Sequence, residues 1–214
     1  MNSISWIFSL IVPIILHMLL SDAAVLLVGQ SENATLCTTL AAVLTIPAAG
    51  WMFYRDGKKH RLESPKRTPG NRLIFGVFCF LAGGILNMVW SGILNLFQIG
   101  EVFSNSTQEA LLAAETALQI AGLGILVPTA EELIFRGLIY NRMKQLLSIR
   151  MSIFFSALLF ALYHGNPIQM IFAFPMALAL TAVYEHGKLL LFPVLFHMGA
   201  NLTAVFANLF ASQL

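Results

Sequence analysis

The sequence has few charged residues: Lys, Arg, Asp and Glu together make up 10% of its 214 residues. A soluble domain carries roughly 25%, whereas 58% of this chain is hydrophobic and its mean hydropathy is +0.80. Several apolar runs reach the ~20 residues that a helix needs to cross a bilayer. The scarcity of charge excludes a separate soluble domain and predicts an all-α, polytopic transmembrane helix bundle. A net charge of +2 does not indicate a nucleic-acid partner, and we expect none.

Cysteine is also scarce, which limits the metal sites that the chain can form. Cys37 and Cys79 both fall inside apolar runs, where we expect them to pack as small hydrophobic side chains. No cysteines have zinc-site spacing, and no HExxH motif is present. The first apolar run lacks the charged start of a cleavable signal, so we expect a retained helix at 5–29.

The apolar runs predict about seven spans, within a range of six to eight. We place them at 5–29, 34–54, 73–98, 110–140, 151–164, 167–184 and 189–210. The fourth is expected to begin as an amphipathic segment at Ser106, where Glu109 completes a capping box. The fifth is short and ends at HGNP, because Gly165 and Pro167 disfavour a continued helix.

The chain divides at residue 105 by the character of its spans. Residues 1–105 hold three spans and a basic loop at 55–72, and residues 106–214 hold the remaining spans. With seven spans, all basic residues except Arg136 fall on one side of the membrane. The positive-inside rule makes that side the cytoplasm and places the N-terminus there. We therefore expect an integral protein of the cell membrane, in contact with lipid.

Three ionisable residues lie together in the fourth span, in the sequence AEELIFRGLIY. Each charge inside a bilayer costs at least ~2.5–3.5 kcal/mol, so such residues indicate a functional site. Glu132 and Arg136 are four residues apart on one helix face and are expected to pair. This pairing leaves Glu131 free to act chemically.

Two later spans each carry a histidine: His164 in FALYHGN, and His197 in FHMGANL with Asn201 one turn further on. From the ~1.5 Å rise per residue, Glu131, His164 and His197 lie roughly 16, 20 and 14 Å from the boundary at the basic segments. These similar depths predict one site built by three spans. We expect it in the half of the membrane nearer to the basic segments, with its opening there.

Two chemistries fit a carboxylate, two imidazoles and an amide. In the first, Glu131 is a general base for water, while His197 and Asn201 donate hydrogen bonds to the oxyanion of amide hydrolysis. In the second, Glu131, His164 and His197 bind zinc and leave one coordination position for water. The spacing of these residues does not decide between the two.

EELIFRG, FALYH and HMGAN together resemble the three motifs of the CPBP family of intramembrane proteases, EExxxR, FxxxH and HxxxN, in the same order. That family includes the type II CAAX prenyl endopeptidases and bacterial Abi proteins. The resemblance covers about 117–210, a little under half the chain. It implies a helix bundle with a conical active-site cavity inside the membrane, and it makes residues 106–214 the catalytic core.

The resemblance also implies an activity and a role for each motif residue. The chain is expected to be an endopeptidase that cuts a membrane-associated peptide or protein; in a bacterium, this is a bacteriocin, leader or signalling peptide. Glu131 is implied as the water-activating carboxylate and His164 as its partner. His197 and Asn201 are implied as the oxyanion site.

Glu132 and Arg136 are implied as structural support for the helix that carries the catalytic glutamate. We expect no required cofactor, with Zn²⁺ as the alternative. Two rival functions remain: a non-catalytic immunity or scaffold protein of the same fold, and a metal or proton transporter, which also uses buried carboxylates and histidines.

Overall fold

The structure, a computed structural model, describes residues 3–29, 33–60, 68–102 and 106–211, and its described elements are helices. Six described helices are long and apolar enough to cross a membrane: Trp6–Val28, Ala34–Lys58, Pro69–Leu96, Thr116–Met143, Pro167–Gly187 and Leu191–Ala211. A shorter apolar helix covers Ile149–Tyr163. The protein is an all-α integral membrane helix bundle, as the sequence predicts.

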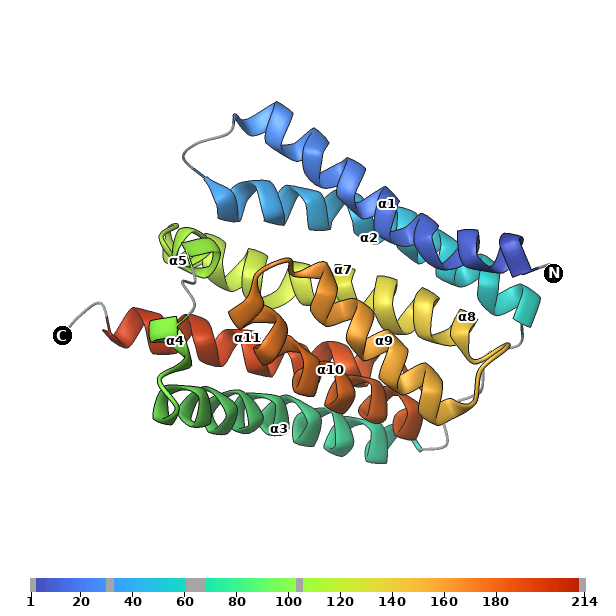
Figure 1. Ribbon diagram of the computed structural model, residues 1–214. Helices are drawn as coiled ribbons and strands as arrows, with labels where there is room; N and C mark the ends of the chain where they lie inside the picture. Colours follow the sequence, from blue (N-terminus) through green and yellow to red (C-terminus); the bar gives the residue numbers. More distant parts are fainter. Residues whose placement is uncertain (1–2, 30–32, 61–67, 103–105, 212–214) are drawn as a thin grey trace.

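The segment that carries both glutamates, Thr116–Met143, runs through the middle of the bundle. On one side lie α1 (Ser3–Val28) and α2 (Ala34–His60). On the opposite side lie α3 (Pro69–Leu96) and α11 (Leu191–Ala211) (Figure 1). The central segment packs against both α2 and α11, so more than half of it is buried by protein.

α9 (Ile149–Tyr163) and α10 (Pro167–Gly187) form a hairpin that spans only part of the bundle. The chain turns at the predicted HGNP sequence, because Gly165 has a φ of +67° and Asn166 caps α10 by accepting from the Ile168 N–H at 3.0 Å. At ~1.5 Å per residue α9 is about 22 Å long, less than the ~30 Å of a hydrocarbon core. Figure 1 shows the hairpin tip short of the end where the C-terminus lies.

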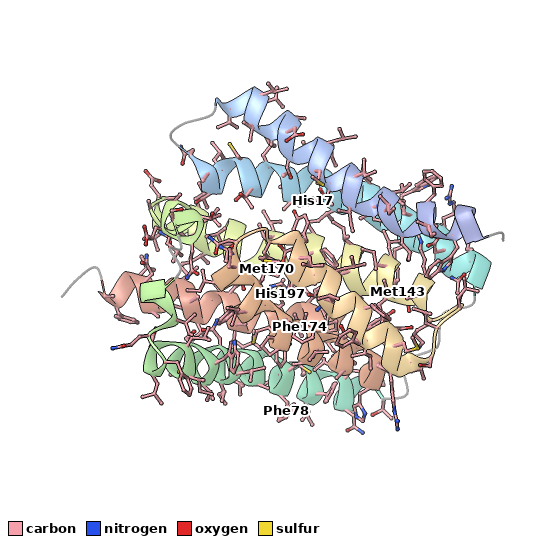
Figure 2. All side chains as sticks on the ribbon, viewed as in Figure 1. His17, Phe78, Met143, Met170, Phe174 and His197 are labelled. Atoms are coloured by element: carbon pink, nitrogen blue, oxygen red, sulfur yellow. The ribbon has the colours of Figure 1, made fainter. Side chains whose placement is uncertain are left out.

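α3 and α11 approach each other closely because glycines face the partner backbone. A Cβ on Gly83 would collide with the carbonyl oxygen of Phe196, and a Cβ on Gly199 would collide with that of Phe80. Close packing through small residues is a main source of attraction between helices in lipid. The outer face of α3 is apolar, and Phe78 points away from the bundle with 63% of its surface exposed (Figure 2). The glycine contact therefore fixes the depth and rotation of α11.

The described basic residues, with one exception, lie at one end of the bundle, which we call the basic end. There Arg142 contacts Asp56 of α2 at 2.6 Å, and Lys144 and Lys188 both pair with Glu185. Three members of the predicted basic loop at 55–72 lie outside the described residues: Arg61, Lys66 and Arg67. The single-sided distribution is confirmed for the part of the chain that the structure describes, and the cytoplasmic location of this end stays a prediction.

The fourth span differs from its predicted range of 110–140. Its expected amphipathic start is a separate helix, α5 (Ser106–Leu112), which runs across the bundle rather than along it (Figure 1). The span itself begins at Thr116 and continues to Met143. The division at residue 105 stays a prediction about the sequence, because in space α3 packs along α11 across that division.

Candidate active site

The two glutamates lie on a short α-helix between two π-helices. α7 (Val127–Glu132) follows η1 (Gln119–Leu126) and precedes η2 (Leu133–Tyr140). A π-helix bonds each N–H five residues back and is rare, and π segments are frequent at functional sites. The hydrophobic pattern of the sequence gave no indication of this change of hydrogen-bond register.

Pro128 explains why a side chain of the last span forms a hydrogen bond to the backbone of the first π-helix. The Val127 N–H donates to the Gly122 carbonyl in π register. The next donor in that register is the nitrogen of Pro128, which carries no hydrogen. The carbonyl of Leu123 therefore lacks this intrahelical donor, and the side-chain amide Nδ2 of Asn201 donates to it at 2.9 Å. A side chain of α11 thus completes the backbone hydrogen bonding of the glutamate segment.

Glu132 and Arg136 form the ion pair that their spacing predicts, with Nη1 and Oε1 2.9 Å apart and both side chains fully buried. Arg136 also donates to the Ala177 carbonyl at 3.1 Å and to the Thr181 hydroxyl at 3.3 Å, both on α10. The ring of Phe160 lies 4.6 Å from the guanidinium carbon. A buried ion pair is tolerated only when such additional contacts satisfy it. We call these residues the Glu132–Arg136 network; it ties the central segment to the α9–α10 hairpin.

His197 lies in the interior of the bundle (Figure 2), and its ring approaches both glutamates. Its Nδ1 is 2.9 Å from Oε1 of Glu132, and its Nε2 is 3.7 Å from Oε2 of Glu131. A carboxylate accepts hydrogen bonds and does not donate them, so Nδ1 carries the hydrogen. The Glu132–Arg136 network therefore orients the imidazole and directs its second nitrogen toward Glu131. The sequence predicted His197 as a site residue, but it did not predict the contact with Glu132.

His164 follows the last residue of α9, and one of its ring nitrogens is held by the helix. Nδ1 lies 2.8 Å from the carbonyl oxygen of Phe160. Because a carbonyl only accepts, Nδ1 is the protonated nitrogen. Nε2 has no partner among the described residues, so its lone pair is available to a ligand or to water.

Glu131, His164, His197 and Asn201 all line one cavity of about 660 Å³. Ligand pockets measure roughly 300–1,000 Å³, so this cavity is large enough for several residues of a peptide. The structure thus brings the four predicted site residues together from three spans. Glu131 is 9% exposed, whereas its neighbour Glu132 is fully buried.

The cavity opens at the end opposite to the one that we expected. Its deep wall is apolar and includes Met176, while its exposed polar lining includes Asn95, Thr107 and Gln108. These polar residues lie at the end of the bundle farthest from the basic end, near α4 (Ile99–Val102). The expected opening near the basic end is wrong, because the short α9–α10 hairpin leaves space on its far side.

The residues proposed as zinc ligands share the cavity without forming a ligand set. Among the described residues, no three histidine, cysteine, aspartate or glutamate side chains lie close enough together to hold a metal ion. A catalytic zinc site needs three such protein ligands. Glu131, His164 and His197 as placed here therefore do not form a ligand set that fits zinc.

Two polar residues of the site were not predicted. Tyr163 and His17 both line a small cavity together with Glu131. Tyr163 immediately precedes His164 in FALYH, so its position next to a motif histidine was an available signal. His17 comes from α1, and nothing in the local sequence indicates that it meets the glutamate segment.

Comparison with protein families gives an independent description of this part of the chain. The model of the family described as type II CAAX prenyl endopeptidase Rce1-like matches residues 113–203. This part of the chain, a little under half of it, is similar to the Rce1-like family. No curated protein and no solved structure matches the chain.

The matched region contains every motif residue of the candidate site. It begins just before the fourth span and ends in α11, and it includes all six polar residues that the motifs single out: Glu131, Glu132, Arg136, His164, His197 and Asn201. The helices α1, α2 and α3 lie outside the matched region. They nevertheless enclose it, since α2 packs on the glutamate segment and α3 on α11.

Proposed function

We propose that the protein is an intramembrane endopeptidase that hydrolyses a peptide bond by means of a water activated by Glu131. The observation that carries this proposal is the meeting of Glu131, His164 and His197 in one large cavity, with the Glu131 carboxylate open to it. The similarity of residues 113–203 to the Rce1-like family supports the reaction class.

Glu131 and His164 activate the water. The carboxylate of Glu131 accepts one proton of the water, while the unpartnered Nε2 of His164 accepts a hydrogen bond from the other. This division of roles follows from the His164 tautomer, because its Nδ1 is held by the Phe160 carbonyl. The water oxygen then forms a bond to the carbonyl carbon of the substrate, which gives a tetrahedral intermediate with a negatively charged oxygen.

His197 and Asn201 stabilise that oxyanion by donating hydrogen bonds. His197 donates from Nε2 only when it carries a second proton, since its Nδ1–H is directed to Glu132. The two carboxylates, the Arg136 guanidinium and this imidazolium then cancel in charge, as a buried site requires. One amide hydrogen of Asn201 is used on the Leu123 carbonyl, and the second is available to the oxyanion.

Breakdown of the intermediate completes the hydrolysis. The carbon–nitrogen bond breaks, and Glu131 returns the proton that it took from water to the departing amine. One water is consumed, and the products are a carboxylic acid and an amine. The apolar deep wall, which includes Met176, fits an apolar side chain next to the cleaved bond.

The position of the opening narrows the class of substrate. If the basic end faces the cytoplasm, as the positive-inside rule predicts, the cavity opens toward the opposite leaflet. The substrate is then a membrane-associated peptide or protein segment on the outer side, such as a bacteriocin, leader or signalling peptide in a bacterium. The amide of Asn95 and the hydroxyl of Thr107 at the opening can bond to a peptide backbone.

Cleavage of a library of membrane-anchored fluorogenic peptides tests the proposal. We expect purified, lipid-reconstituted protein to cut at least one peptide, and Glu131→Gln to lower kcat by about 10²–10⁴-fold. Glu115→Gln is the matched control, because it makes the same change in the exposed residue before Thr116. A chelator is expected to leave the activity unchanged.

Three other results would contradict this mechanism. Activity that a chelator removes and zinc restores would assign the water activation to a metal. Full activity in Glu131→Gln would remove Glu131 from the reaction. No cleavage of any peptide, with Glu131→Gln still supporting the cellular function of the wild type, would leave a non-catalytic immunity or scaffold protein.

A further inference from the structure

Glu131 lines a second, smaller cavity on the side facing α1 and α2. This cavity measures about 150 Å³, and its wall includes His17 and Ser21 of α1 and Cys37 of α2. Four residues line both cavities: Thr38, Val127, Glu131 and Tyr163. The catalytic glutamate of the proposed function therefore stands in the partition between two compartments.

The small cavity contains polar groups that no protein atom satisfies. One ring nitrogen of His17, Nδ1, lies 2.7 Å from the Thr45 hydroxyl, and the other has no partner among the described residues. The hydroxyl of Tyr163 likewise has no hydrogen-bond partner in the described part of the chain. Glu131 has one carboxylate oxygen 3.7 Å from His197, and for its other oxygen the described residues provide no partner. Polar groups in the interior of a helix bundle are costly unless they are hydrogen-bonded, so these three point to water.

The volume of the small cavity agrees with this interpretation. A water molecule occupies ~30 Å³ in the liquid, so the cavity has room for about five. A bound water needs two to four polar partners, and His17, Tyr163 and Glu131 supply three. The large cavity differs in that its deep wall is apolar and it is wide enough for a peptide.

We propose that the small cavity is a water-binding site that supplies the hydrolytic water to Glu131 from the side opposite to the substrate. This inference rests on the proposed peptidase function. A peptide that fills the large cavity displaces water from it, yet each turnover consumes one water. A separate compartment resolves this conflict, with His17 and Tyr163 as positioning residues that hold water next to the carboxylate.

The first test fills the small cavity and leaves the large one unchanged. Ala42→Leu adds three carbons at a residue that lines only the small cavity. We expect kcat to fall about tenfold to a hundredfold, with KM for the peptide unchanged. Ala48→Leu is the matched control: it makes the same change on α2 at a half-buried residue outside both cavities, and we expect wild-type kcat.

The second test uses the natural cysteines and does not depend on stable variants. Cys37 lines the small cavity, whereas Cys79 is fully buried in the contact with α10 and α11 and serves as the internal reference. We expect charged aminoethyl methanethiosulfonate to modify Cys37 and not Cys79, since thiolates react from water. Modification of Cys37 is expected to lower kcat without changing KM.

The outcomes separate this inference from the proposed function. Wild-type kcat in both Ala42→Leu and the Cys37-modified protein would overturn the water site and leave the peptidase intact. A rise in KM with unchanged kcat would make the small cavity part of the peptide site instead. If the wild type cleaves no peptide, the peptidase function fails, and a Cys37 that resists the reagent shows separately that the small cavity is dry.

Discussion

Glu131 and Glu132 are adjacent in the sequence and lie in opposite surroundings. Glu132 is fully buried, and Arg136 and His197 both contact it at 2.9 Å. Glu131 faces two cavities, and its nearest described charged partner is the His197 ring at 3.7 Å. A helix directs consecutive side chains about 100° apart. Glu132 therefore points to the α9–α10 hairpin, and Glu131 points to the cavities. The same chemical group is thus structural at one position and available for reaction at the next.

The comparison shows how a bundle in lipid can support a reactive carboxylate. The Glu132–Arg136 network holds three helices together and orients His197 toward Glu131. The cavity side has unsatisfied groups on Glu131, His164 and Tyr163, which are of use only to water or a ligand. The contacts that stabilise the bundle lie on one side of the helix, and the groups available for reaction lie on the other. Substitutions on the first side are therefore expected to change the free energy of unfolding, and substitutions on the second side to change kcat.

The largest expected effect on stability comes from Arg136→Met. Removing the guanidinium breaks a buried ion pair and leaves the Glu132 carboxylate with the His197 imidazole as its remaining partner, which costs about 3–5 kcal/mol of the free energy of unfolding. The double variant Arg136→Met, Glu132→Gln removes both charges and is expected to recover part of this loss. Unfolding followed by circular dichroism in detergent measures both proteins. Equal stabilities of Arg136→Met and the wild type would show that the network does not hold the bundle together.

An intermediate effect is expected at the contact between α3 and α11. Gly199→Ala places a methyl group against the Phe80 carbonyl oxygen, and such overpacking costs about 1–3 kcal/mol. Turnover is also expected to fall, because α11 carries His197 into the site. Gly92→Ala is the control, since a Cβ there meets no atom within 4 Å. If the two variants unfold at the same temperature, the close helix contact is not what positions α11.

The smallest expected effect on stability is at Asn201, where one substitution can separate a structural role from a catalytic one. Asn201→Ala removes the donor to the Leu123 carbonyl, which costs about 1 kcal/mol of stability. It also removes an oxyanion donor, which lowers kcat by about 10²–10³-fold. Pro128→Ala adds a backbone N–H that can serve Leu123, so the double variant is expected to regain stability without regaining turnover. Recovery of both in the double variant would restrict Asn201 to its structural role.

Local sequence rules were sufficient for the helices and for one of the contacts in the site. The apolar runs predicted the spans, and the i, i+4 spacing predicted the pair of Glu132 with Arg136. The turn at HGNP followed from Gly165 and Pro167. These features depend on neighbours within a few residues, which a single sequence displays directly.

The remaining features of the site depend on partners that are distant in the sequence. The π register of η1 is completed by Asn201, which comes from the last span. The contact of His197 with Glu132 and the place of His17 in the small cavity likewise require three-dimensional packing. The direction of the opening was mispredicted because depth along each helix says nothing about which end of the bundle the short hairpin leaves uncovered.

The most direct test of the account measures turnover and unfolding temperature side by side for Glu131→Gln and Glu132→Gln. We expect Glu131→Gln to lower kcat by about 10²–10⁴-fold while keeping the unfolding temperature of the wild type. Glu132→Gln is expected to lower the unfolding temperature, because Arg136 loses its charged partner. A Glu131→Gln protein that cleaves peptide at the wild-type rate, or that unfolds as readily as Glu132→Gln, would contradict the division between a reactive and a structural glutamate.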